Sequence, residues 1–173
     1  MKRPIAMLFL TWSRSALNGE MNATITIRPE SAIIIETSPM RLIFSARSVR
    51  ARRKARDRYG RNRYGQQALL ARRLIEAGTG FANVVMEHPG GQAPRDTVYN
   101  WDCHAVNCHV FNDSRWRVPN FDRAVSALIE DIYQRNLDRR VMLIVMGEFG
   151  HTPRITYEVG SQTHVKQPGR DHW

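Results

Sequence analysis

An unbroken apolar run, Val141–Met146, constrains the fold more than any other part of this sequence. Six consecutive apolar residues suit a strand that is buried on both faces, as in a parallel sheet covered by helices. Gly147, Gly150 and Pro153 follow at once, and glycine and proline so close together end regular structure. The sequence therefore predicts a central strand that exits into a tight loop.

Polar side chains of several chemical kinds occupy that loop. Glu148, His151, Thr152 and Arg154 offer a carboxylate, an imidazole, a hydroxyl and a guanidinium directly after the predicted strand. In open α/β sheets, ligands bind beside the carboxyl ends of the strands. The loop is therefore a candidate site, and the alternative is a plain strand exit with solvated polar residues.

The elements before this strand predict an α/β arrangement. Apolar residues at helical spacing predict helices over Gln66–Ala77 and Asn120–Asn136, the second with Asn120 as its N-cap. Phe81–Met86 has the composition of a second buried strand. Strand, helix and strand then form a βαβ unit, whose loops approach one edge of the sheet.

A long polar segment, Glu87–Val118, lies between the first strand and the second helix. Such long loops are usually functional or disordered. Asp102 and His104 stand two residues apart, so in an extended segment they lie on one side and can bind one cation. Cys103 and Cys108 could pair if the loop allows it, or join neighbouring histidines in a closed zinc site with unfamiliar spacing.

The positive charge is confined to the first third of the chain. Residues 1–63 hold 14 Lys and Arg against 4 acids, whereas residues 64–173 hold 12 of each. Arg47–Arg63 carries nine of these cations, which suits a solvated helix or a disordered arm. Nucleic-acid binding through this block is the less favoured alternative, because the part that bears the motifs is neutral.

Residues 1–46 show no consistent period. Ala23–Ile27 and Ala32–Thr37 are rich in Ile and Thr and could form short strands. Met1–Arg3 and the apolar Ile5–Trp12 have some features of an export signal, but the run is short and lacks a clear cleavage site. No run is long enough to span a membrane. The compartment and the oligomeric state stay open.

Several segments together resemble a known family. They are YGQQALLARRLIEAG, FANVVM, WDCH, FDRAVSALIEDI, VMLIVMGEFGHTPRI and GRDHW. Their order and spacing resemble the domain-of-unknown-function 1501 family, over about Asp57–Trp173. Its members are often described as sulfatase-like and often exported, and they are similar to the alkaline phosphatase superfamily. The resemblance implies a three-layer α/β/α fold with a mostly parallel sheet, of which residues 57–173 would be a part and residues 1–56 an unassigned basic region.

The same resemblance implies a metal centre that acts on phosphate or sulfate esters. The implied cofactor is a divalent cation: zinc, calcium, magnesium or manganese. The metal ligands would be Asp102, His104, Glu148 and His172, and the supporting or anion-binding residues would be His151, Arg154, Arg170 and Asp171.

Two departures from the superfamily pattern matter for activity. Glu148-Phe149 stands where the superfamily has an Asp-His pair, and residues 1–56 contain no match to the first strand with its nucleophile. We therefore expect a fragment of a metal-binding hydrolase. The alternatives are a non-catalytic module with the same fold and, less favoured, a nucleic-acid-binding protein.

Overall fold

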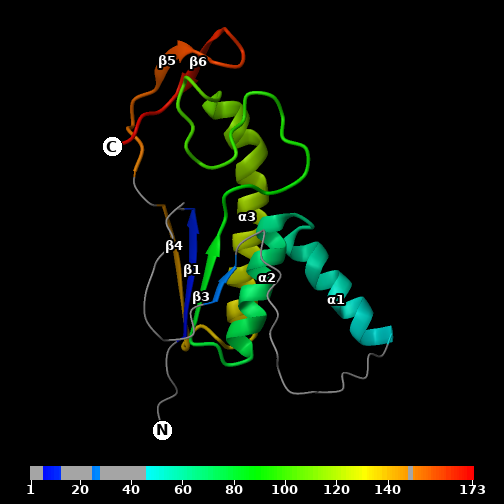
Figure 1. The fold of residues 1–173 in the computed structure, drawn as a ribbon. Helices are drawn as coiled ribbons and strands as arrows, with labels where there is room; N and C mark the ends of the chain where they lie inside the picture. Colours follow the sequence, from blue (N-terminus) through cyan, green and yellow to red (C-terminus); the bar gives the residue numbers. More distant parts are fainter. Residues whose placement is uncertain (1–5, 13–24, 28–45, 148–149) are drawn as a thin grey trace.

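The fold is mixed α/β (Figure 1). The computed structural model describes residues 6–12, 25–27, 46–147 and 150–173, with side chains from residue 52 onward. Its elements are β1 (Ala6–Trp12), β2 (Ile25–Ile27), α1 (Ala46–Tyr59), α2 (Arg63–Glu76), β3 (Phe81–Val85), α3 (Val110–Gln134), β4 (Val141–Gly147), β5 (Thr156–Val159) and β6 (Lys166–Gly169). The predicted strand Ala32–Thr37 and the predicted ligand Glu148 lie outside the described residues.

Four strands form one parallel sheet in the order β2-β3-β1-β4. The predicted strands β3 and β4 are both present, but β1 lies between them. β4 stands at the end of the strand order, and none of Val141–Met146 is buried against the described residues. The prediction of a central strand buried on both faces is therefore wrong for β4, whereas β1 takes the inner position. β1 comes from the segment that was weighed as the apolar part of an export signal. Thr11 pairs with Val85 on one side and with Met146 on the other. The three strands thus end at one edge of the sheet, and the loops after β3 and β4 leave from that edge.

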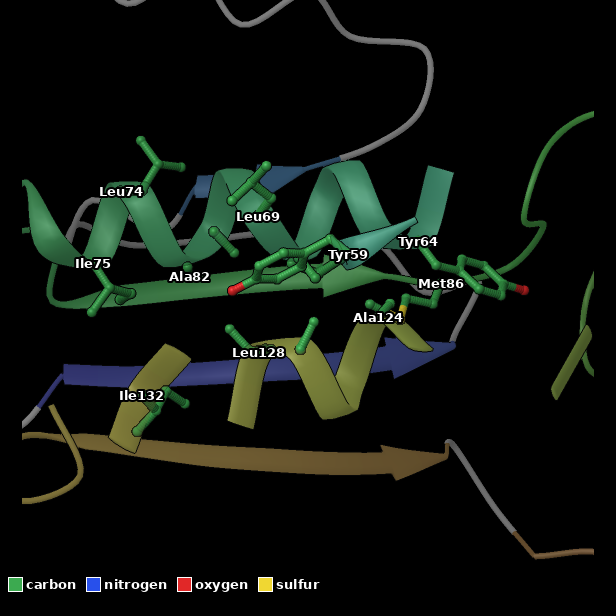
Figure 2. Close-up of a cluster of buried hydrophobic side chains, with 14 of the residues drawn as sticks. Tyr59, Tyr64, Leu69, Leu74, Ile75, Ala82, Met86, Ala124, Leu128 and Ile132 are labelled. Carbon is green, nitrogen blue, oxygen red and sulfur yellow. The ribbon is translucent and has the colours of Figure 1, made fainter. Parts of the chain in front are cut away.

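The three helices contact one another and form a single layer, with α2 packed on β3. Ala82 and Val84 of β3 are fully buried, whereas the residues on either side of them are only half-buried, as expected for a strand with one face under helices. Figure 2 shows the resulting core, in which Leu69 of α2 and Leu128 of α3 are also buried. The described residues place helices in one layer, so the three-layer arrangement stays a prediction.

Helix α2 begins earlier than the sequence predicted because Asn62 caps it. The Asn62 side chain accepts a hydrogen bond of 2.9 Å from the Gly65 amide and satisfies one of the free donors of the first turn. At the other end Gly78 has a φ of +104°, a conformation that glycine adopts readily. The helix thus ends within one residue of the predicted bound, Ala77.

Helix α3 is longer than predicted, and Asn120 is not its N-cap. The helix starts at Val110 and continues through Pro119. Proline removes an amide donor from a helix interior. Beside it, the Asn120 side chain donates 2.9 Å to the Trp116 carbonyl and accepts 3.0 Å from Asn62. The irregular segment therefore ends at residue 109 rather than at Val118.

The basic block is helical over α1, and its end is anchored in the core. Tyr59 is fully buried and donates 2.8 Å to the Asp131 carboxylate, which also pairs with Arg58. Lys54 and Arg56 are exposed, as in the solvated-helix alternative. None of the helices in the described residues has both the length and the apolar character that a membrane crossing requires.

Candidate metal centre

The loop after β3 is fixed to the helical layer by Arg117. This guanidinium is fully buried and forms two 2.7 Å contacts with the Asp113 carboxylate. It also donates to the carbonyls of Glu87 and Val98, the latter at 2.7 Å. Since a buried cation needs such partners, both ends of this stretch of loop are held in place. The Trp101 side chain donates 2.5 Å to the carbonyl of Met86, the residue directly after β3.

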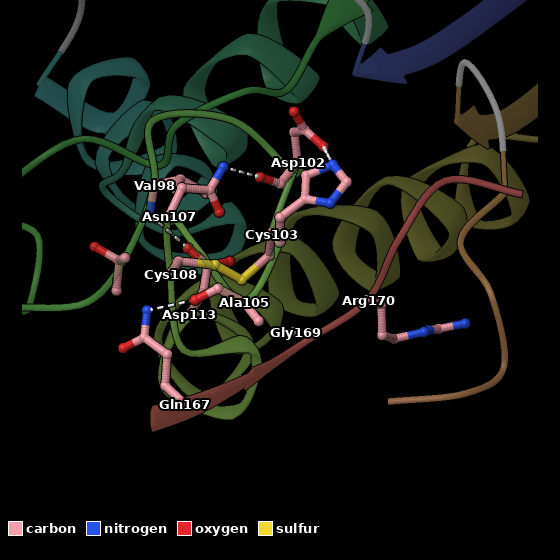
Figure 3. Close-up of a disulfide and its surroundings, with 12 residues drawn as sticks. Val98, Asp102, Cys103, Ala105, Asn107, Cys108, Asp113, Gln167, Gly169 and Arg170 are labelled. Atoms are coloured by element: carbon pink, nitrogen blue, oxygen red, sulfur yellow. Dashed lines mark hydrogen bonds and ion pairs between the residues drawn. A yellow bond between two sulfur atoms is a disulfide. The ribbon is translucent and has the colours of Figure 1, made fainter. Parts of the chain in front are cut away.

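Cys103 and Cys108 form a disulfide, with their Cα atoms 5.4 Å apart (Figure 3). Both residues are buried. This settles the two alternatives that the sequence left open for the pair. An oxidised pair has no thiolate, and zinc binds the thiolate form, so the closed Cys-His zinc site is wrong.

Two short segments that follow β4 and β6 pair in antiparallel fashion. Thr152 N donates 2.9 Å to Asp171 O, and Trp173 N donates 3.0 Å to Gly150 O. His151 and His172 form the bridge between these bonds. Residues directly opposite each other in an antiparallel pair project from the same side. The two imidazoles therefore face one region, with ring centroids 5.5 Å apart.

Four side chains from three segments converge there. The Asp102 Oδ1 atom lies 2.8 Å from His104 Nε2 and 2.7 Å from His172 Nε2, and the two nitrogens are 3.0 Å apart. One ligand atom each from Asp102, His151 and His172 lies within 4.8 Å of the others. These three residues form a group that could hold a metal ion.

Two of the imidazole rings, those of His104 and His151, are held in orientation by a contact at Nδ1. His104 Nδ1 lies 3.4 Å from Asp171 Oδ1, and His151 Nδ1 lies 3.3 Å from the Arg170 carbonyl oxygen. Metal-binding histidines commonly donate one ring N–H to a carboxylate or carbonyl, which fixes the tautomer and leaves the other nitrogen for the metal. The arrangement leaves Nε2 as the ligand nitrogen of both residues.

The cluster favours the protonation states that bind cations. Burial acts to raise the pKa of Asp102, but the hydrogen bond with His172 and the nearby imidazoles outweigh it and lower that pKa below its ordinary value. Partial burial lowers the pKa of His151, with the hydrogen bond to Arg170 acting in the opposite direction. A carboxylate and a neutral imidazole are the forms that coordinate metals.

The donor atoms lie slightly closer together than the ligands of a bound metal. Donors around a tetrahedral zinc lie about 3.4 Å from one another, given zinc–ligand bonds of about 2.1 Å. The observed separations of 2.7–3.0 Å between Asp102, His104 and His172 are hydrogen-bond distances and are shorter than that spacing, so a bound metal would need these side chains to move apart slightly. The side chains of Asp102 and His172 are 38% and 45% exposed, so the cluster is open to a ligand from solvent.

The residues of this site lie in a part of the chain that matches a known protein family. A protein-family model described as "Protein of unknown function (DUF1501)" matches residues 47–173. The chain belongs to the DUF1501 family. Neither a curated protein nor a solved structure matches the chain. The family match begins ten residues before the boundary expected from the sequence, and thus includes most of α1.

The remaining site residues expected in this DUF1501 chain have different surroundings. Arg170 donates from Nε to the Thr152 carbonyl at 2.5 Å and from Nη2 to the His151 carbonyl at 3.0 Å, so it holds the segment that bears His151. Arg154 is exposed, and its carbonyl accepts from the Thr152 hydroxyl at 3.1 Å. Glu148 lies outside the described residues.

The docking of β6 on the loop that contains Asp102, His104 and Ala105 was not predicted from the sequence. Gln167 is buried and donates 2.8 Å to the Ala105 carbonyl, and Arg170 N donates 3.2 Å to Cys103 O. Gly169 lies so close that a Cβ atom there would be 1.8 Å from Ala105 N. Gly169 was visible in the sequence as the first residue of GRDHW, but nothing there indicated a close backbone approach across more than sixty residues.

Proposed function

We propose that this DUF1501 chain binds a divalent metal ion at Asp102, His104, His151 and His172 and belongs to a hydrolase of phosphate or sulfate esters. The observation that carries the proposal is the convergence of these donors, two of them held from the Nδ1 side by Asp171 and the Arg170 carbonyl. Metal-binding histidines almost always have the second ring nitrogen bonded in this way.

The donor set favours zinc, with manganese as the next choice. Three imidazoles and one carboxylate supply mostly nitrogen. Calcium and magnesium prefer sites built from oxygen, whereas imidazole suits zinc and the transition metals. Of the four cations that the family resemblance implies, calcium and magnesium therefore fit these residues less well.

The chemistry proposed for the site follows from its openness and from its charge. A bound divalent cation polarises an ester oxygen as a Lewis acid. Asp102 and His172 are partly exposed, so an anionic ester could reach the site from solvent. The bound cation would itself be the largest local charge and would attract the anionic ester.

A non-catalytic, metal-binding module is the second candidate. Cys103 and Cys108 are bonded to each other, so neither is a nucleophile. The Thr152 hydroxyl, which is beside His151, is donated to the Arg154 carbonyl. An attacking group for hydrolysis would then have to come from water or from residues outside the described part of the chain.

The test compares two histidine variants of the metal-free, oxidised protein. His104→Asn removes a proposed ligand, whereas His164→Asn changes an exposed histidine in the turn between β5 and β6. Asparagine tolerates the left-handed backbone at residue 164, where φ is +55°. We expect zinc titration by calorimetry to show affinity at least about tenfold weaker for His104→Asn and unchanged for His164→Asn.

The same proteins are then assayed with p-nitrophenyl phosphate and p-nitrophenyl sulfate, with zinc, manganese, magnesium or calcium added. Metal-dependent turnover that is lost in His104→Asn supports a hydrolase. Zinc binding without turnover supports the non-catalytic module. Equal zinc affinity in both variants would show that the cluster is not a metal site.

A further inference from the structure

We propose that the Cys103–Cys108 disulfide is a positioning element of the metal site, so that the oxidised chain binds the metal more tightly than a chain without the bridge. This inference rests on the proposed metal site and adds a covalent link that controls its affinity. The bridge and the bound metal would then stabilise each other.

The first step is the place of Cys103 between two proposed ligands. Asp102 and His104 flank it in the sequence, and their side chains meet at 2.8 Å. Figure 3 shows Cys103 directed toward Cys108 and Asp102 on the other side. The bridge thus holds the backbone that presents both ligands.

The second step is the small loop that the bridge closes. Cys108 N donates 2.9 Å and Asn107 N donates 3.1 Å to the His104 carbonyl. The Asn107 side chain donates 3.0 Å to the Asp102 carbonyl. The end of the loop therefore folds back onto both ligand residues, and the disulfide fixes this return covalently.

The third step is energetic. A disulfide removes conformations that the open chain would otherwise sample. An open loop would present Asp102 and His104 in many orientations, and only the fraction with the ligands converged would bind. Because coupling between two equilibria is reciprocal, a metal that binds the bridged loop more tightly must also stabilise the bridge against reduction at equilibrium. A bound metal also holds the loop closed, which would lower the fraction of time in which the bridge is accessible. Both cysteines are buried, so a reductant reaches the bridge only when the loop opens.

The first experiment measures zinc affinity in the full chain. Cys103→Ser and Cys108→Ser are combined, so that no free thiol remains to bind zinc. We expect the dissociation constant for zinc to rise by about 10–100-fold, the range seen when the support of a metal ligand is removed. Leu128→Ala is the control, because it destabilises the core without touching the loop, and its zinc affinity should match that of the unmodified protein.

The second experiment needs no variant that could fail to fold. The oxidised protein is treated with a water-soluble phosphine, with and without saturating zinc, and thiols are counted over time. Cleavage of the Sγ–Sγ bond gives two thiols, while the phosphine takes the oxygen of one water molecule and the two protons of that water go to the sulfurs. We expect zinc to slow this reaction at least about tenfold, and His104→Asn to abolish the protection.

The outcomes separate the two proposals. Zinc affinity within twofold in the double serine variant, or reduction at one rate with and without zinc, would overturn the role of the disulfide while leaving the metal site intact. Absence of zinc binding by the oxidised, unmodified protein would overturn both.

Discussion

The helical layer is stabilised by different forces from those that stabilise the metal-site region, which is the part of the chain around Asp102, His104, His151 and His172. Around Leu128 and Val84 the core is apolar, and these side chains have no exposed surface. Around Asp102 and His172 the side chains are polar and partly exposed, and the backbone is held by hydrogen bonds, a disulfide and one close approach at Gly169. Apolar burial supplies most folding free energy, whereas the second kind of contact fixes geometry. Stability and metal affinity should therefore respond to different substitutions.

Arg117 lies at the boundary between the two regions. Its Nη1 atom donates 3.2 Å to the buried Tyr64 hydroxyl in the core and also to the Glu87 carbonyl at the start of the loop. Its Nη2 atom reaches the Val98 carbonyl at 2.7 Å. The buried Arg117 side chain therefore fixes the loop after β3 relative to the helices.

The largest effect is expected for Arg117→Met, which should lower both the stability of the fold and the affinity for zinc. It leaves the buried Asp113 carboxylate without its partner, and breaking a buried ion pair costs about 3–5 kcal/mol. Urea unfolding should show this loss, and zinc affinity should fall as well because the loop loses its anchor. The double variant Asp113→Leu/Arg117→Met removes both charges and should recover part of the stability. A loss below about 1 kcal/mol would show that Arg117 is not the link.

Leu128→Ala should separate the regions, because it affects only the core. Leu128 is fully buried, and such truncations cost about 2–5 kcal/mol. Urea unfolding should show this loss while zinc affinity, measured where the protein remains folded, stays unchanged. A weaker zinc affinity in this variant would mean that the site depends on core packing more than the contacts indicate.

The core was largely predictable because apolar periodicity reports burial. The pattern at Leu74 and Leu128 gave two helices, and the apolar composition of Phe81–Met86 and Val141–Met146 gave two strands. β1 was not assigned because a short apolar run after a basic start is equally compatible with an export signal. The predicted helix start at Asn120 was wrong because helix α3 begins at Val110 and continues through Pro119.

The candidate site was only partly accessible from the sequence. The spacing of Asp102 and His104 and the family resemblance to GRDHW indicated where to look. The pairing of His151 with His172, the disulfide and the approach of Gly169 to Ala105 depend on contacts between distant segments. No local pattern encodes such contacts, because hydrogen bonds between backbone groups leave no mark on residue type.

Alkaline pH should lower the stability of the fold through ionisation of Tyr64, which accepts a hydrogen bond from Arg117. Burial raises the pKa of the Tyr64 hydroxyl to about 12, with Arg117 acting in the opposite direction. Between pH 10 and 12 the unfolded chain releases this proton and the folded chain keeps it, so stability falls as pH rises. At about 1.4 kcal/mol per pKa unit, the loss approaches about 3 kcal/mol. Urea unfolding from pH 9 to 11.5 should show the slope, and Tyr64→Phe should be flatter.

The smallest effect on folding, and the sharpest effect on the site, is expected for Gly169→Ala. The added methyl group would lie 1.8 Å from Ala105 N and must push β6 away from the loop. Overpacking of this kind costs about 1–3 kcal/mol. Because Arg170 N bonds to Cys103 O beside it, the shift should also separate Asp102 from His172.

Zinc calorimetry and urea unfolding of the Gly169→Ala protein measure both consequences, with Gly80→Ala as the matched control. Gly80 is exposed, and a methyl group there would meet nothing within 4 Å. We expect zinc affinity to fall at least about tenfold for Gly169→Ala and to stay unchanged for Gly80→Ala. Leu128→Ala should show the opposite pattern, with a large loss of stability and no loss of affinity. If Gly169→Ala changed stability alone, the docking of β6 would be a folding contact like those of the core, and the division between the two regions would fail at that point.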